Sequence, residues 1–487
     1  MSKKNLFISL LALPLSLMTL GPAVAQTAPQ SNAVSENALI ARGQYLAHAG
    51  DCAACHTVSG HKLYSGGYSF HMPMGEIVSG NITSSKKFGI GTWSEKDFAN
   101  AVRKGILPNG RHLYPAMPYT AYANITDDDI HALYVYFQHV PAVETAPEKK
   151  SQLKFPFNLP GLMTVWNFLY AKQQPFQPDP TLNSEENRGK YLVEGLGHCS
   201  TCHTPRNQML SEDMGKFLTG AYVQNWHAPN ITSDAVSGIG GWSDQELFSY
   251  LKTGRAVGKS QAGGPMAEAI VQSFQYLTDH DIKAIISYLR KVPAVRTPGQ
   301  TSTSWSVTKP KEDKWNHYET GGSKNDQPGY RDISTLNGAM LYNNNCAACH
   351  GINGEGSEDH IFPSLTQNSA VGADDPTNLV MSIYEGIHRQ GVDYKAVMPA
   401  FSQQYQAIHN WLSPAQIAAI SNYVTERFGQ GNAHLKAADV NYITSRATDT
   451  APFLIRNAAI LAAIGIVTGV VILILLFVMI SKSRRRP

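Results

Sequence analysis

The chain has 487 residues, of which 43% are hydrophobic and 16% are charged. This composition can bury hydrophobic cores and excludes an intrinsically disordered protein, and the length corresponds to about three domains. The formal net charge of +3 includes two lysines in residues 1–25 and four cations in residues 481–487, which leaves −3 for residues 26–480. A mildly acidic body argues against a nucleic-acid partner.

The first 25 residues have the pattern of a secretory signal peptide. Two lysines precede a mostly apolar run over residues 6–20, and an A-x-A cleavage site ends at Ala25. We therefore expect residues 1–25 to be removed and the remainder of the chain to be exported.

Six cysteines form three copies of the motif C-x-x-C-H, and no cysteine lies outside them. The copies are Cys52-Ala-Ala-Cys55-His56, Cys199-Ser-Thr-Cys202-His203 and Cys346-Ala-Ala-Cys349-His350. Two thiols at this spacing can form thioethers to the two vinyl groups of one porphyrin, and the adjacent histidine can then bind the iron. We therefore expect three covalently bound heme c groups, attached at the six cysteines and ligated by His56, His203 and His350.

Disulfides and zinc sites are the alternative uses of these cysteines. An exported protein with six cysteines is often cross-linked by disulfides, and C-x-x-C pairs also occur in zinc and thioredoxin-type sites. A zinc ribbon requires two such pairs that close on one ion, whereas successive motifs here are 147 residues apart. Equal spacing instead indicates a repeated unit with one heme per copy.

The segments around the first two motifs are alike. Both carry an R-G-x-Y-L sequence before the motif, at residues 42–46 and 188–192, and an N-I-T sequence after it, at residues 81–83 and 230–232. A Gly-Ile-Gly sequence and a tryptophan follow each N-I-T. The third copy is more divergent, because it keeps Gly338 upstream of its motif but lacks the tryptophan.

One methionine in each copy is the candidate for the second axial ligand of the iron, a position that methionine commonly fills in electron-transfer hemes. Each copy has a glycine that ends a predicted turn, and the residue 12 positions later is a methionine. These pairs are Gly105 with Met117, Gly254 with Met266, and Gly386 with Met398. A proline follows Met117 and Met398, which favours extended backbone at both. The competing methionines have no counterparts at matching positions and are expected in cores or loops; they are Met72, Met74, Met209, Met214 and Met381.

A helix is expected after each candidate methionine, because apolar residues recur there at helical spacing. The periodic stretches begin at Ile130, Ile282 and Ile417, and six positions further on stand Tyr136, Tyr288 and Tyr423. Residues 413–416 have the form of a capping box with proline at the first helical position. Core packing is the expected role of the three tyrosines.

Each copy resembles a small class I cytochrome c domain, which has an N-terminal helix, the C-x-x-C-H motif, a loop with the methionine ligand and a closing helix. The resemblance covers residues 36–146, 183–296 and 333–430, which we call the first, second and third repeats. It implies that a glycine of the first helix lets that helix cross the last one closely, against an aromatic side chain. The implied pairs are Gly43 with Tyr136, Gly189 with Tyr288, and Gly338 with Tyr423.

The connecting segments differ in composition. Residues 147–182 are rich in large apolar and aromatic side chains, so this segment is expected either to fill space between domains or to form a surface for a partner subunit or the membrane. Residues 297–332 form a polar, solvated linker, which Trp305 and Trp315 could pin to a neighbouring domain. Residues 431–455 show little periodicity.

The C-terminal end has the composition of a membrane anchor. Residues 458–480 contain no charge and are long enough to cross a bilayer, and the basic tail of residues 481–487 follows. By the positive-inside rule, the tail is cytoplasmic and the residues before the anchor are periplasmic. We therefore expect a mainly α fold of three tandem class I cytochrome c domains plus one C-terminal transmembrane helix, residues 457–480.

Motifs for substrate chemistry are missing from the sequence. It contains no dinucleotide-binding, Walker or nucleophile-elbow motif, so we expect no catalytic residue on this chain. Over nearly the whole mature chain, including residues 113–119, 198–206 and 264–269, it resembles the triheme cytochrome c subunit of membrane-bound periplasmic dehydrogenases. That family includes fructose, sorbitol and gluconate 2-dehydrogenases, whose large subunit carries FAD, and pyrroloquinoline-quinone alcohol dehydrogenases.

This resemblance implies a protein of the cell inner membrane with its bulk in the periplasm. Its partners would be a flavoprotein or quinoprotein large subunit, a small accessory subunit and ubiquinone, to which it would pass electrons. The alternative is the cytochrome c subunit of a terminal oxidase or another respiratory complex. A heme-based gas sensor would need an open distal position, and the three candidate methionines argue against one.

Overall fold

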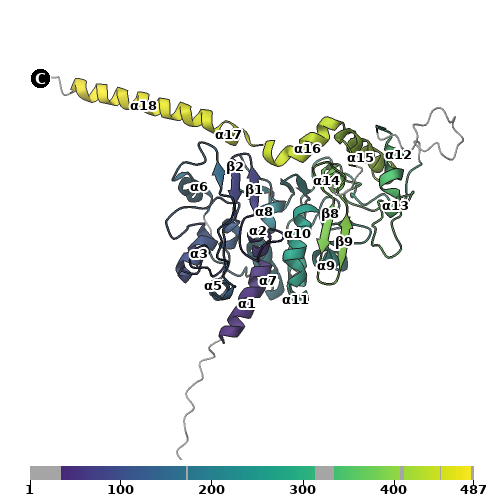
Figure 1. The fold of residues 1–487 in the computed structure, drawn as a ribbon, viewed down its shortest axis with the longest axis horizontal. Coiled ribbons are helices and arrows are strands. Elements are labelled where there is room, and N and C mark those ends of the chain that lie inside the picture. Colours follow the sequence, from purple (N-terminus) through teal and green to yellow (C-terminus); the bar gives the residue numbers. More distant parts are fainter. Residues whose placement is uncertain (1–34, 172–173, 313–333, 406–410, 450, 484–487) are drawn as a thin grey trace, which may run out of the picture. The chain divides into compact units, whose positions relative to one another are not determined.

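The computed structural model describes residues 35–171, 174–312, 334–405, 411–449 and 451–483. The expected signal peptide, residues 1–25, lies outside the described residues, as do Trp315 and the last four residues of the basic tail. The helices and strands all belong to one unit, Glu36–Pro487 (Figure 1).

A pair of crossing helices frames each repeat. The pairs are α1 (Glu36–Ala49) with α5 (Asp127–His139), α7 (Ser184–Tyr191) with α11 (Asp279–Leu289), and α12 (Gly338–Asn345) with α15 (Pro414–Phe428). A Cβ atom at Gly43 would lie 2.1 Å from the Ala132 carbonyl oxygen and 2.5 Å from Tyr136 Cβ. Only glycine therefore permits this crossing.

The same close approach occurs in the other two repeats. A Cβ at Gly189 would lie 1.9 Å from Ala284 O and 2.7 Å from Tyr288 Cβ. One at Gly338 would lie 2.5 Å from Ala419 O and 2.7 Å from Tyr423 Cβ. The three implied glycine–tyrosine pairs are confirmed.

Short elements fill each repeat between its two crossing helices. In the first repeat they are α2 (Cys52–His56), β1 (Ser69–Met72), β2 (Gly75–Val78), α3 (Glu95–Lys104) and α4 (Tyr119–Tyr122). In the second they are η1 (Leu192–Leu196), α8 (Cys199–His203), η2 (Met214–Lys216), β4 (Ala221–Val223), β5 (Trp226–Ala228), α9 (Asp244–Thr253), β6 (Arg255–Ala256), β7 (Ser260–Gln261), α10 (Gly264–Gln272) and η3 (Phe274–Tyr276). In the third they are α13 (Ala347–His350), α14 (Thr377–Glu385), β8 (Ile387–Gln390) and β9 (Lys395–Met398).

The strands form small antiparallel ladders that the sequence patterns did not predict. Strand β1 pairs with β2, with Ser69 opposite Val78, and β2 also pairs with β3 (Gln152–Leu153) from the segment after the first repeat. The other ladders are the two-stranded pairs β4–β5, β6–β7 and β8–β9.

The predicted turn glycines are C-caps of helices. Gly105, Gly254 and Gly386 follow α3, α9 and α14, and all three have positive φ, at 62°, 75° and 76°. A positive φ strains residues with a Cβ but not glycine, and Gly105 and Gly254 adopt the left-handed helical conformation that is common at C-caps. The predicted capping box is also confirmed, because Ser413 and Gln416 bond to each other's backbone N–H at the start of α15.

Two main cores lie beneath these helices. One runs continuously through the first and second repeats, from Leu46 and Leu133 to Leu192 and Ile285. The other belongs to the third repeat, and Trp226 of the second repeat is inserted in it. The first two repeats are thus packed together as one body, whereas the third has its own core.

The apolar segment between the first two repeats forms helix α6 (Leu162–Tyr170), which has two different sides. Met163 and Trp166 pack against Tyr119, and the Trp166 indole N–H donates to the carbonyl oxygen of Met209 in the second repeat (2.9 Å). This contact confirms that the segment fills space between repeats. The other side is exposed, with Phe168 at 77%, and a partner or membrane surface there stays a prediction.

The polar linker is held by one tryptophan, as predicted. The Trp305 ring lies edge-on to Trp242 of the second repeat, with 5.8 Å between ring centroids. The Lys259 ammonium lies 4.8 Å from the centre of the Trp305 ring. Trp305 therefore holds its part of the linker against the second repeat.

Residues 431–455, which show little periodicity in the sequence, nevertheless contain helix α16 (Ala437–Asp449). Val440 and Ile443 are buried on the core of the third repeat, and Asn225 of the second repeat bonds to the backbone of Thr444 and Ala447. Two buried apolar residues are too few for a clear helical period, so the helix depends on packing rather than on its own pattern.

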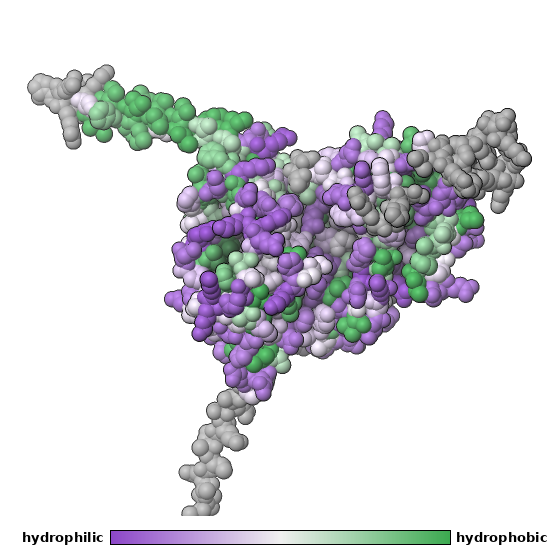
Figure 2. All heavy atoms as spheres, viewed as in Figure 1, coloured by the Kyte–Doolittle hydropathy of each residue, from purple (hydrophilic) through white to green (hydrophobic). Residues whose placement is uncertain are grey.

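The chain ends in α17 (Phe453–Arg456) and the long helix α18 (Ala458–Ser483). Residues Ala458–Ser481 are apolar and long enough to cross a membrane, as predicted for the anchor. Figure 2 shows α18 as an almost continuous hydrophobic surface, unlike the mixed surface of the repeats.

Candidate heme-binding sites

The first C-x-x-C-H motif forms the short helix α2, which opens onto a cavity of about 360 Å³. Cys52, Cys55 and His56 line this cavity, and so does Met117, which lies in the bend before α4. Most other lining residues are apolar. The structure therefore brings together all four predicted ligand and attachment residues of the first repeat, which are up to 65 positions apart in the sequence.

The histidines of the three motifs share one hydrogen bond. The Nδ1 atoms of His56, His203 and His350 lie 2.7, 2.7 and 2.9 Å from the carbonyl oxygens of Gly80, Pro229 and Pro363. Because a carbonyl oxygen can only accept, Nδ1 carries the proton and Nε2 keeps its lone pair. This bond fixes the tautomer and ring orientation that an iron ligand requires.

Burial keeps these histidines neutral. It lowers the pKa of His203 to about 4 and lowers the pKa values of His56 and His350 as well, against the opposing effect of the carbonyl hydrogen bonds. A neutral imidazole is the form that binds a metal.

The first cysteine of each motif is held in the protonated form. Burial raises the pKa of Cys52, Cys199 and Cys346 to about 12. Zinc binding and disulfide exchange use the thiolate, and among the described residues, which include all six cysteines, no disulfide is formed. Burial of these three thiols therefore disfavours the thiolate that either alternative would need.

The N-I-T sequences hold the loops that carry the histidine acceptors. Asn81 Nδ2 donates to Val143 O (2.9 Å), and its Oδ1 accepts the N–H of Thr83 (2.9 Å). In the second repeat, Asn230 bonds in the same way to Val295 and Thr232, at 2.7 and 2.9 Å. Gly80 and Pro229 immediately precede these asparagines, so the motif marked the acceptors, although sequence reasoning did not identify them.

The other two candidate methionines lie on different local structures. Met266 is in helix α10 and packs on the same core as Cys199, whereas Met398 ends strand β9 and packs on the same core as Cys346. The extended backbone expected at Met398 is confirmed. The roles of Met117, Met266 and Met398 as iron ligands stay predictions.

The competing methionines occupy the kinds of position that were predicted for them. Met74 and Met381 are buried in the protein interior, and Met214 is exposed. Met72 ends β1, and Met209 packs beside Trp166.

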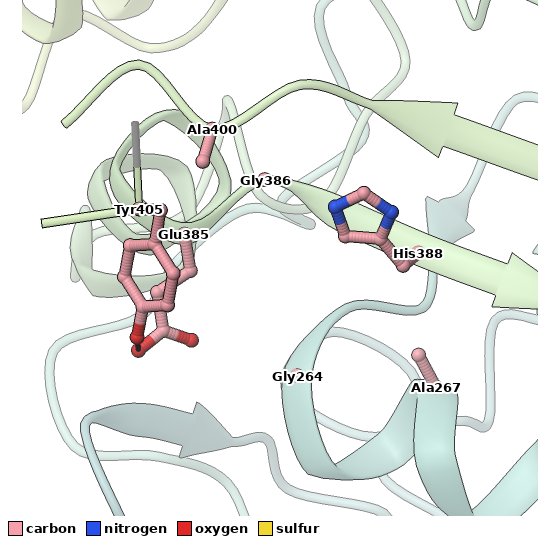
Figure 3. A pocket seen from close by; sticks show the side chains of 7 residues that line it. All are labelled: Gly264, Ala267, Glu385, Gly386, His388, Ala400 and Tyr405. Carbon is pink, nitrogen blue, oxygen red and sulfur yellow. Dashed lines mark hydrogen bonds between the residues drawn. The ribbon is translucent and has the colours of Figure 1, made fainter. Parts of the chain in front are cut away.

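A second cavity, of about 310 Å³, lies between the second and third repeats (Figure 3). Gly264 and Ala267 of α10 border it on one side, and Gly386 and His388 border it on the other. Beside it, Glu385 accepts hydrogen bonds from the Tyr405 hydroxyl (3.0 Å) and from the Trp226 indole (2.9 Å). The chain segments that carry Met266 and Met398 therefore approach each other here.

These observations test whether the chain suits heme c, and it does. Each motif offers a largely buried first thiol and a neutral histidine with a free Nε2, and the first repeat also supplies an apolar cavity with a thioether on its wall. Covalent attachment through C-x-x-C-H with histidine and methionine ligation matches this set of donors.

Comparisons with known proteins identify the family of the chain. The cytochrome c family model matches residues 40–141 and 335–427. The chain is 39% identical to the fructose dehydrogenase cytochrome subunit of Gluconobacter japonicus over 473 residues, which cover 95% of each chain. An alignment of this extent spans all three C-x-x-C-H motifs.

Two further relatives are similar over most of their length. The chain is 35% identical to the gluconate 2-dehydrogenase cytochrome c subunit of Pantoea cypripedii, over 83% of this chain and 89% of the relative. It is 34% identical to the cytochrome c subunit of the quinone alcohol dehydrogenase of Gluconacetobacter polyoxogenes, over 86% of each chain.

Proposed function

The chain belongs to the cytochrome c subunits of dehydrogenase complexes, and on that basis we propose that it is the triheme electron-transfer and membrane-anchoring subunit of a periplasmic dehydrogenase. It accepts electrons from a flavoprotein or quinoprotein catalytic subunit and passes them to ubiquinone in the inner membrane. The observation that carries this proposal is the meeting of Cys52, Cys55, His56 and Met117 in one cavity.

Three tandem domains, residues 36–146, 183–296 and 333–430, each hold one heme c. The attachment residues are Cys52 and Cys55, Cys199 and Cys202, and Cys346 and Cys349. The axial ligands are His56 with Met117, His203 with Met266, and His350 with Met398. When bound, each heme supplies a one-electron redox centre whose potential the protein tunes through ligand type, hydrogen bonding and burial.

The protein's own groups perform the positioning. The carbonyl oxygens of Gly80, Pro229 and Pro363 orient the three histidines, and mostly apolar side chains surround the first site. Two electrons from each oxidised substrate cross the chain one at a time and, with two protons, convert one ubiquinone to ubiquinol. Substrate oxidation itself takes place on the catalytic subunit.

The proposed location is the periplasmic face of the inner membrane, with α18 as a single C-terminal anchor. The uncharged span Ala458–Ser481 of α18 and the cations that follow this span support this orientation. Export through the signal sequence places residues 26–456 where covalent heme attachment and the catalytic partner are found. A small accessory subunit completes the complex.

The direction of electron flow tests the proposal. Membranes that contain the complex are supplied with candidate substrates, namely sugars, polyols, sugar acids and alcohols, and the reduced c-type spectrum is recorded. We expect reduction by one substrate class, lost on removal of the co-purifying flavoprotein or quinoprotein. Reduction by ubiquinol alone would contradict the proposal and support a subunit of a terminal oxidase or another respiratory complex.

A further inference from the structure

The interface between the first two repeats contains a tyrosine that crosses from one repeat to the other. The Tyr45 hydroxyl donates to Asp281 Oδ2 at 2.5 Å. Within the second repeat, Arg188 binds the same carboxylate with two N–H groups, at 2.8 and 2.6 Å. Tyr45 also accepts the backbone N–H of Thr278 at 3.2 Å. One hydroxyl of the first repeat thus joins the carboxylate and the N-terminus of α11 in the second.

The reverse contact has the same form. The Tyr191 hydroxyl donates to Asp129 Oδ2 at 2.6 Å, and Arg42 binds this carboxylate with two N–H groups, at 2.9 and 2.6 Å. The N–H of Thr126, the N-cap of α5, donates to Tyr191 at 3.4 Å. The two R-G-x-Y-L sequences therefore make equivalent contacts in opposite directions. We call the Tyr45–Asp281 and Tyr191–Asp129 hydrogen bonds the crossed clasp.

Each hydrogen bond of the clasp ends on a buried carboxylate, so its loss should be costly. Asp129 and Asp281 are only 3% and 4% exposed, and a buried carboxylate is costly unless hydrogen bonds satisfy it. Burial raises the pKa of Asp281, but the hydrogen bonds from Arg188 and Tyr45 outweigh this effect and leave the pKa below its ordinary value. The carboxylate is therefore ionised at neutral pH and needs the tyrosine as a partner.

The third repeat lacks every component of the clasp. The positions of the arginine, tyrosine and aspartate are occupied there by Asn337, Met340 and Gln416. Gln416 instead bonds within its own repeat, to the backbone oxygen of Thr335 at 3.3 Å. The clasp therefore distinguishes the first two repeats from the third, in agreement with their continuous core.

The clasped interface lies next to the candidate heme sites. Leu196 of the second repeat lines the cavity of the first site. The Tyr122 hydroxyl donates to Gly50 O at 2.5 Å, and the Tyr122 ring lies 5.6 Å from that of His198, which immediately precedes Cys199. Of the residues just before the second C-x-x-C-H motif, Leu196 therefore forms part of the wall of the first cavity, and His198 contacts that wall.

We propose that Tyr45 and Tyr191 are positioning residues that clamp the first two repeats into one rigid pair, which holds their two heme sites at a fixed separation and orientation for direct one-electron exchange. The exchange moves one electron between the two sites and makes or breaks no bond. This inference rests on the proposed binding of heme in both repeats.

Tyr45→Phe, Tyr191→Phe and the double variant test the clasp in the full-length complex, because each substitution removes only a hydroxyl. Tyr134→Phe is the matched control, since its hydroxyl donates to Trp93 O (3.0 Å) within the first repeat. Loss of one hydrogen bond to a charged group is expected to raise the equilibrium ratio of separated to packed repeats about tenfold. Loss of both hydroxyls should raise this ratio further. Covalent heme content, the split Soret circular dichroism of neighbouring porphyrins and the rate of heme-to-heme electron exchange are measured for each variant.

We expect the double variant to keep its hemes but to lose split Soret intensity and exchange rate, while Tyr134→Phe keeps both. A double variant with wild-type intensity and rate would overturn the clasp. If the double variant does not accumulate, the same measurements on Tyr45→Phe alone decide whether the clasp holds the two repeats together. Wild-type protein without heme in either repeat would contradict the proposed function instead, so the two failures are distinguishable.

Discussion

Replacing Gly189 with alanine is expected to destabilise the second repeat by about 3 kcal/mol, near the upper end of typical overpacking costs. The new Cβ would lie 1.9 Å from the carbonyl oxygen of Ala284, and a backbone atom of a buried helix cannot move aside as the end of a flexible side chain can. Helices α7 and α11 would have to separate. Urea unfolding of the purified chain measures the change.

Gly215→Ala is the control, because this glycine too belongs to a helical element of the second repeat, the short η2. A Cβ added at Gly215 would have a side-chain oxygen of Asp213 as its nearest neighbour, at 3.3 Å. We therefore expect the free energy of unfolding to change by no more than about 0.5 kcal/mol. Equal stability of the Gly189 and Gly215 variants would show that α7 and α11 do not cross as closely as described.

Replacing Met117, Met266 or Met398 with alanine, one at a time, is expected to remove the sulfur-to-iron charge-transfer absorption of one heme. Each variant should lose about one third of the band, because each of the three hemes has one thioether ligand in this account. The freed coordination position should then bind an added ligand such as imidazole or carbon monoxide. Absorption spectra of the oxidised and reduced protein record both effects.

Met214→Ala is the matched control for this series, since Met214 is an exposed methionine of the second repeat. It should leave the band intact. An unchanged band in all three candidate variants would reject the 12-residue spacing rule and would direct the search to the other methionines.

The features that could be predicted from the sequence depend on local chemistry. The C-cap glycines and the capping box of α15 follow from rules that involve only a few consecutive residues. The glycine–tyrosine pairs were predictable for another reason, namely that three copies of one pattern can be compared with each other. The implied approach of Gly43, Gly189 and Gly338 to tyrosines therefore held in all three repeats.

The missed features depend on contacts that a linear pattern does not show. Among the described side chains of α16, only Val440 and Ile443 are buried, and the helix is held by packing on α15 and α14 rather than by a pattern of its own. The strands of the β ladders are half-exposed, and with only two to four residues each they are too short for a reliable alternation of apolar and polar residues. The histidine acceptors are backbone carbonyls, which any residue can supply.

The crossed clasp could be predicted from the sequence only in part. The shared R-G-x-Y-L sequences were visible, and their absence from the third repeat marked the first two as a pair. Asp129 and Asp281, however, lie 87 and 93 residues after the arginines that bind them. The tyrosine of one repeat contacts the aspartate of the other, so comparison of single repeats could not reveal the exchange.

A pyridine hemochrome assay on the purified mature chain, with protein quantified by amino-acid analysis, tests the central claim most directly. Three C-x-x-C-H motifs with neutral, oriented histidines predict about three covalently bound hemes per chain, retained after acid–acetone extraction. A value of two or fewer, or heme that the extraction removes, would contradict the account.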